Sequence, residues 1–193
     1  MNSTSKKLLF ASALILVGVF FFPLWNINLE APQYPEGLGI RIWINQITGY
    51  KENDLENING LNHYIGMKPI DPDDIPELKI MPFAVGIMIL FGLFNAFKGN
   101  SKTVYTWIIL FLTLGAIGLY DFYVWEYNYG HNLNPNAPIK VPGMSYQPPL
   151  IGSKQLLNIN AVSLPSISSF IILISVLLAV IAIIVDKKKS KTT

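Results

Sequence analysis

The fold is decided by the stretch SISSFIILISVLLAVIAIIV, residues 166–185, in which no side chain is charged. A bilayer core about 30 Å thick needs about 20 helical residues, so this stretch predicts a membrane-spanning helix. Three other apolar stretches of similar length lie at residues 8–25, 81–97 and 104–125. We therefore expect an all-α membrane protein with four transmembrane helices and two long extracytoplasmic loops, forming a single membrane domain over residues 1–193.

The composition agrees with this class and narrows the chemistry. Hydrophobic residues make up 51% of the chain and charged residues only 13%, whereas a soluble domain carries about 25% charged residues. The absence of cysteine excludes disulfides, thiolate metal sites and thiol nucleophiles. The sequence also lacks the G-x-S-x-G, H-E-x-x-H and glycine-rich phosphate-loop motifs of common enzymes. We expect a protein that is not an enzyme and does not bind nucleic acid.

The lysines predict the orientation of the four helices. Eight of the 14 basic residues lie in short segments next to helix ends that share one side of the membrane. These residues are Lys6, Lys7, Lys98, Lys102, Lys187, Lys188, Lys189 and Lys191. Basic segments of this kind remain in the cytoplasm. Both termini are therefore expected inside, and loops 26–80 and 126–165 outside.

Two further features bear on the membrane and on the first helix. Lysine is used almost to the exclusion of arginine, and isoleucine and asparagine are abundant, which suggests an AT-biased bacterial genome. We therefore expect a multi-pass protein of the bacterial cytoplasmic (inner) membrane. The basic start and apolar stretch of residues 8–25 also resemble a signal peptide, but PLWNINLEAPQ, which follows, offers no clear cleavage site. An uncleaved anchor is favoured.

The two outer loops differ in their sequence patterns. The segment LGIRIWINQITGY, residues 38–50, is β-branched and partly alternating, and could be a strand or an interfacial segment. The helix over residues 104–125 is expected to continue past the membrane and to stop at Gly130. The Pro-rich segment NPNAPIKVPGMSYQPPLIGSK, residues 134–154, is expected to be ordered and to pack against the first loop.

Each of the two histidines precedes a methionine in a predicted outer loop. His63 is followed by Met67, and His131 by Met144. Imidazole and thioether groups are common ligands of Cu(I), so these four residues form a candidate copper site that would join the two loops. In the alternative interpretation His63 makes a hydrogen bond to a loop carbonyl and Met67 fills an apolar gap.

Two acidic residues and several aromatic residues lie at the outer end of the third helix. Asp121 and Glu126 could form a proton relay with His131 or orient its ring; the alternative is that they are anchors at the membrane interface. The aromatic residues of this region are Tyr120, Tyr123, Trp125, Tyr127 and Tyr129. They could form the mouth of a site for a small lipid or a quinone.

Four segments carry a resemblance to a known group of proteins. They are GLNHYIGM (60–67), PELKIMP (76–82), YGHNLNPNAPIKVPG (129–143) and YQPPLIGSK (146–154). In these segments and in its four-helix plan, the chain resembles small membrane proteins associated with bacterial nitrous-oxide reductase gene clusters. The resemblance implies an accessory protein for an extracytoplasmic copper enzyme, acting in maturation, copper delivery or electron supply.

Three functions therefore stay open from the sequence. The first is the copper-enzyme accessory protein, with copper as its cofactor. The second is a non-catalytic membrane scaffold or complex subunit that docks a periplasmic partner through its Pro-rich loops. The third is a small membrane protein that handles a lipid or quinone. All three imply contact with membrane lipid, the first two imply a periplasmic or membrane protein partner, and a homodimer is compatible with each.

Overall fold

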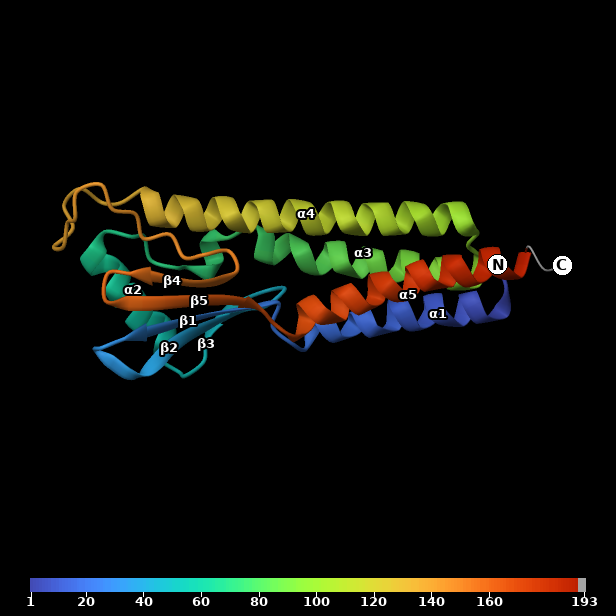
Figure 1. Ribbon diagram of the computed structural model, residues 1–193, viewed down its shortest axis with the longest axis horizontal. Helices are drawn as coiled ribbons and strands as arrows, with labels where there is room; N and C mark the ends of the chain where they lie inside the picture. Colours follow the sequence, from blue (N-terminus) through green and yellow to red (C-terminus); the bar gives the residue numbers. More distant parts are fainter. Residues whose placement is uncertain (191–193) are drawn as a thin grey trace.

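The computed structural model describes residues 1–190 and has two parts, a bundle of long helices and a smaller part that contains a β-sheet (Figure 1). The chain is 57% helical and 16% strand. The expected all-α class is therefore wrong, and the protein is a mixed α/β protein. The sheet is built from the two segments that the sequence predicted to be loops.

Four helices are long and apolar enough to cross a membrane, which confirms that prediction by length and composition. The first is α1 (Ser3–Ile15), continued by the 3-10 helix η1 (Leu16–Phe20). The others are α3 (Glu77–Lys98), α4 (Ser101–His131) and α5 (Ile167–Ser190). Asn100 is the N-cap of α4 and forms a capping box. Its side chain accepts from the backbone N–H groups of Lys102 and Thr103, and its own backbone N–H donates to the Thr103 hydroxyl.

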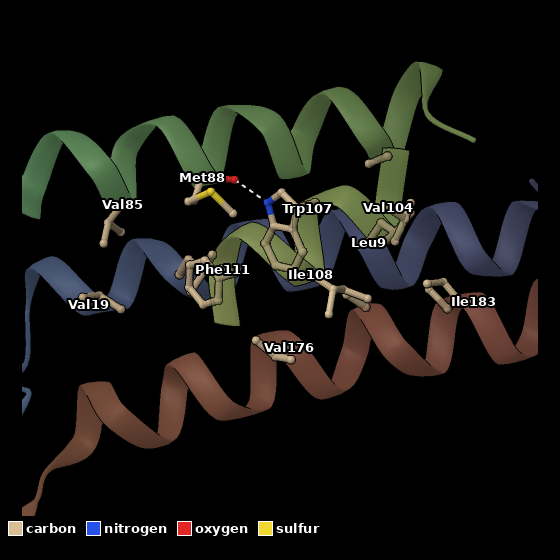
Figure 2. Packing of buried hydrophobic residues seen from close by; sticks show 14 of the residues in the cluster. Leu9, Val19, Val85, Met88, Val104, Trp107, Ile108, Phe111, Val176 and Ile183 are labelled. Carbon is tan, nitrogen blue, oxygen red and sulfur yellow. Dashed lines mark hydrogen bonds between the residues drawn. The ribbon is translucent and has the colours of Figure 1, made fainter. Parts of the chain in front are cut away.

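The bundle is held together by packing and by hydrogen bonds between helices. Trp107 of α4 is buried at its centre, where the indole nitrogen donates to the carbonyl of Met88 in α3 over 2.8 Å (Figure 2). On the other side of the bundle, the hydroxyls of Ser12 in α1 and Ser175 in α5 each donate to the backbone carbonyl of the other residue, both over 2.8 Å. Such reciprocal bonds hold small residues of two helices close together in an apolar surrounding.

The start of α1 and the end of α5 lie together at the end of the bundle farthest from the sheet (Figure 1). The backbone nitrogen of Asn2 donates to the carboxylate of Asp186 over 2.7 Å. Lys187 lies over the ring of Tyr105, with 5.2 Å between its nitrogen and the ring centroid. The lysines used to predict orientation therefore gather at this end, apart from Lys191, which lies outside the described residues.

The other end carries a five-stranded antiparallel sheet with the order β3-β2-β1-β5-β4. The strands are β1 (Trp25–Ala31), β2 (Tyr34–Ile42), β3 (Ile47–Gly49), β4 (Gly152–Leu156) and β5 (Ile159–Pro165). The central pair joins the two predicted loops, with Trp25 opposite Pro165. Because β1 follows η1 and β5 precedes α5, the sheet is attached directly to two helices of the bundle.

Alternation of side chains along β1 explains how this sheet forms a core. Trp25, Ile27 and Ala31 are buried, whereas the intervening Asn26 and Asn28 are only partly buried. A period of two places one set of side chains on a single face of a strand. That face packs against α2 (Asp54–Ile65), which begins after Asn53 and ends at Gly66 with a left-handed backbone. A short 3-10 helix, η2 (Pro72–Asp74), leads towards α3.

The last turns of α4 also belong to this part of the molecule. The 31 residues of α4 span roughly 46 Å, more than the roughly 30 Å of a bilayer core. Phe122 packs edge-to-face on Trp25, with 5.5 Å between ring centroids, and the Tyr129 hydroxyl donates to the Pro69 carbonyl over 3.0 Å. Figure 1 shows α4 running past the start of α3 beside the sheet. We call residues 25–76 and 122–165 the head.

Candidate functional site

The head contains a cavity of about 180 Å³ between the sheet, α2, the end of α4 and the segment that follows α4. Its wall is mostly aliphatic and aromatic. The lining residues include Ile27, Leu29, Ile40, Leu61, Tyr64, Met67, Trp125, Glu126, Tyr129, Ile139, Tyr146 and Pro148. We call this space the head cavity.

Regular spacing places these side chains in the wall. Ile27 and Leu29 of β1 are two residues apart, so both lie on the face of the sheet that α2 covers. Ile58, Leu61 and Ile65 of α2 recur every three or four residues and share one helix face. The Pro-rich segment after α4 completes the enclosure through Tyr146 and other residues.

Glu126 is the one acidic residue among the described residues that line this apolar wall. Its side chain has no exposed surface, and neither carboxyl oxygen has a hydrogen-bond partner within the described part of the chain. Burial away from water raises the pKa of Glu126 to about 8. No lysine or arginine is among the residues that line the cavity. The group is therefore most stable as a neutral carboxylic acid at neutral pH.

Tyr146 is a second buried polar group in the same wall. It is 2% exposed, and its hydroxyl has no hydrogen-bond partner among residues 1–190. Its backbone nitrogen donates to the carbonyl of Gly130 over 2.9 Å, which fixes the segment against the end of α4. A side chain at position 130 would collide with the backbone of Gln147, so only glycine allows this close approach.

The predicted copper ligands of the first loop lie at the end of α2. His63 is in the last turn of the helix, so it does not lie in a loop as expected. Its ring is exposed and packs edge-to-face on Tyr64, with 6.0 Å between centroids. Met67 follows the helix cap and forms part of the cavity wall.

The predicted ligands of the second loop have different surroundings. His131 is the last residue of α4, and its exposed ring stacks on Tyr127 at 3.9 Å between centroids. Its Nδ1 lies 3.0 Å from the Tyr127 carbonyl oxygen, so the tautomer with a proton on Nδ1 donates there and leaves Nε2 without that proton. Met144 is half-buried, and its backbone nitrogen donates to the Val141 carbonyl over 3.1 Å.

The structure brings together the chain segments that follow the two histidines. The backbone nitrogen of Asn134 donates to the Gly66 carbonyl over 2.7 Å, and that of Ile139 to the Tyr64 carbonyl over 2.9 Å. The head cavity nevertheless includes Met67 without either histidine or Met144. Within residues 1–190 there is no group of three or more His, Asp or Glu side chains placed to hold a metal. The four-residue copper site stays a prediction.

The aromatic residues at the end of α4 fall into two sets. Trp125 and Tyr129 line the head cavity and pack on each other with 4.4 Å between ring centroids. Tyr120, Tyr123 and Tyr127 are exposed on other faces of the helix. Only the first set can contact a molecule in the cavity.

Sequence reasoning named Glu126 but gave it another role. The sequence predicts for it an interface anchor or a relay partner of His131, whereas the structure places Glu126 in the cavity wall and His131 outside that wall. The available signal was its position four residues after Phe122 and three before Tyr129, on the face of α4 that carries aromatic side chains. Tyr146 was missed, because the Pro-rich segment has no periodicity that marks one side chain as buried.

Comparisons with protein-family models, with curated proteins and with solved structures find no match to this chain. The resemblance to proteins of nitrous-oxide reductase gene clusters therefore has no support from them and stays a prediction.

Proposed function

We propose that the protein is a non-enzymatic component of the bacterial cytoplasmic membrane whose head lies outside the cytoplasm and binds a small, largely apolar molecule. This proposal is nearest to the third of the functions left open by the sequence, with a small apolar molecule in place of a lipid or a quinone. The observation that carries it is the head cavity of about 180 Å³ with its aliphatic and aromatic wall. Ligand sites are typically concave and mostly apolar, with a few polar groups, and apolar cavities of about 150 Å³ hold a benzene-sized molecule.

The proposed membrane location is supported by the outer faces of the bundle. Large apolar side chains are exposed there, among them Phe83, Leu90 and Phe97, which are each at least 65% exposed. Lipid tails would cover such side chains. The grouping of lysines at the end of the bundle where α1 starts and α5 ends supports a head on the opposite, extracytoplasmic side.

The Pro-rich segment supports ligand binding over partner docking. Ile139, Tyr146 and Pro148 face the head cavity, and the backbone of the segment bonds to α2. The segment is thus used to enclose space within the head. No comparable observation favours the copper-enzyme accessory role or the scaffold role.

The test is the identification of small molecules that remain bound after gentle purification. The full chain is isolated in native lipid, extracted, and analysed by mass spectrometry. Leu61→Phe narrows the cavity from α2, and Leu55→Phe makes the same change on the same helix outside the cavity wall. We expect an apolar compound of one or two rings, or of similar volume, with wild type and Leu55→Phe but not with Leu61→Phe. An identical set of compounds for all three proteins would refute the proposal.

A further inference from the structure

We propose that the head cavity selects an uncharged apolar molecule that carries a hydroxyl group, a phenol or an alcohol, and that Glu126 recognises this hydroxyl as a neutral carboxylic acid. The inference rests on the proposed function, because it names the class of ligand that the same cavity takes. Its basis is the position of Glu126 and Tyr146, the two cavity-lining side chains whose buried polar atoms have no partner in the described chain.

An unpartnered carboxyl group in an apolar wall is costly to the fold. Burying a polar group without a hydrogen bond is unfavourable, and burying an unpaired charge is far more so. An aliphatic side chain of similar size would remove that cost and fill the same space. Neither carboxyl oxygen of Glu126 has a partner within residues 1–190, so hydrogen bonds from a bound molecule would offset a cost of burial that no described protein group offsets.

The surroundings of Glu126 decide the charge of that molecule. Besides Glu126, the polar side chains that line the cavity from the helices and the later segments are Asn62 and Tyr64 of α2, Tyr129 of α4, Tyr146 of the segment after α4, and Asn158 of the turn between β4 and β5. The lining from β1 and β2 is apolar apart from Gln33 in the turn between them. With no cationic side chain in the wall, the neutral acid is the stable form, and a neutral acid offers one donor and one acceptor.

A hydroxyl group matches this pair of atoms. It accepts from the carboxyl O–H and donates to the carboxyl carbonyl or to the Tyr146 oxygen, so a single small group can satisfy atoms that are otherwise unpaired. The rest of the molecule lies against Ile27, Ile40 and Trp125, which suits a hydrocarbon or an aromatic ring. A cation would require the carboxylate form, and an anion would meet no positive charge.

Two matched probes test this inference in the full chain held in lipid nanodiscs, with empty nanodiscs as the blank. The probes are para-trifluoromethylphenol and trifluoromethylbenzene, which differ by one hydroxyl, and binding is measured by fluorine NMR near pH 6. One satisfied neutral hydrogen bond is worth about tenfold in affinity. We expect wild type to bind the phenol about tenfold more tightly than the benzene.

Three variants separate the neutral acid from a carboxylate. Glu126→Gln keeps a donor and an acceptor and should keep the preference for the phenol, whereas Glu126→Leu should bind both probes equally. Glu52→Gln changes an exposed head carboxylate and should behave as wild type. Loss of the preference in Glu126→Gln, or tighter binding of para-trifluoromethylbenzylamine than of the phenol, would overturn the inference in favour of a carboxylate that binds a cation.

The remaining outcomes distinguish the two proposals. Equal binding of phenol and benzene by wild type would overturn the role of the hydroxyl and leave an apolar ligand site in place. Binding of neither probe above the blank would overturn both the inference and the proposed function. Tyr146→Phe removes one hydroxyl from the wall. A weaker preference for the phenol over the benzene in this variant would support a hydrogen bond between the ligand hydroxyl and the Tyr146 oxygen.

Discussion

Replacement of Glu126 by glutamine should make the head more stable at alkaline pH and leave it nearly unchanged at acidic pH. In the folded protein burial raises the pKa of Glu126 from 4.5 to about 8. Between these values the folded state holds the proton and the unfolded state has released it. The free energy of unfolding therefore falls as pH rises from about 4.5 to 8, and it is fully retained below 4.5.

The size of the effect follows from the two pKa values. Each tenfold change in proton affinity corresponds to about 1.4 kcal/mol, so the carboxyl group costs at most about 5 kcal/mol above pH 8 and about 3 kcal/mol at pH 7. Glutamine carries no proton to lose. A change of 1 kcal/mol shifts the melting temperature of a chain of this size by roughly 2–4 °C, so the variant should melt on the order of 10 °C higher at alkaline pH.

The assay is thermal unfolding in nanodiscs at about pH 5 and about pH 8.5, followed by tryptophan fluorescence, because Trp25 and Trp125 both lie in the head. Tyr129 does not titrate in this range, since burial raises its pKa from 10. Glu52→Gln is the matched control and should show the same small difference from wild type at both values. If Glu126→Gln and wild type differ equally at the two pH values, the carboxyl group is not held neutral by burial.

Three further measurements test the bundle, the head packing and the histidines. In a double-mutant cycle, Ser12→Ala and Ser175→Ala should show a coupling of about 0.6 kcal/mol in detergent unfolding, because the two hydroxyl oxygens lie 3.0 Å apart, within hydrogen-bond distance of each other; independent effects would contradict that contact. Gly130→Ala should lower head stability by about 1–3 kcal/mol, because its methyl group meets a packed backbone; an unchanged melting temperature would contradict that packing. If the copper prediction is right, His63→Ala with His131→Ala lowers Cu(I) affinity at least about tenfold in a competitor titration, and an unchanged affinity excludes it.

The sequence predicts the helices of this protein much better than its sheet. A run of about 20 apolar residues is a local signal, because the bilayer demands it of each helix independently. The strands have no such local requirement. β1 is alternating but begins directly after an apolar helix, so residue Trp25 was assigned to the helix and not to the strand.

The pairing of β1 with β5 could not be predicted because its partners lie far apart in the chain. Trp25 and Pro165 are opposite each other in the sheet, and each is next to a membrane helix. The pairing of these strands accompanies the packing of α1 against α5, in which Ser12 is bonded to Ser175. A long-range contact of this kind leaves no pattern within either segment.

The candidate site also lies in a different place from the one that the sequence predicts, again because it depends on contacts between segments that are far apart in the chain. Rare histidines and methionines attract attention in a sequence, but His63 and His131 are exposed at helix ends. Glu126 is an ordinary residue type just beyond an apolar stretch, and only the sheet and α2 make its position unusual. A carboxyl group becomes chemically distinct when the fold removes its water and its partners. Glu126, on which the proposed ligand site depends, therefore owes its unusual surroundings to three chain segments that meet around it.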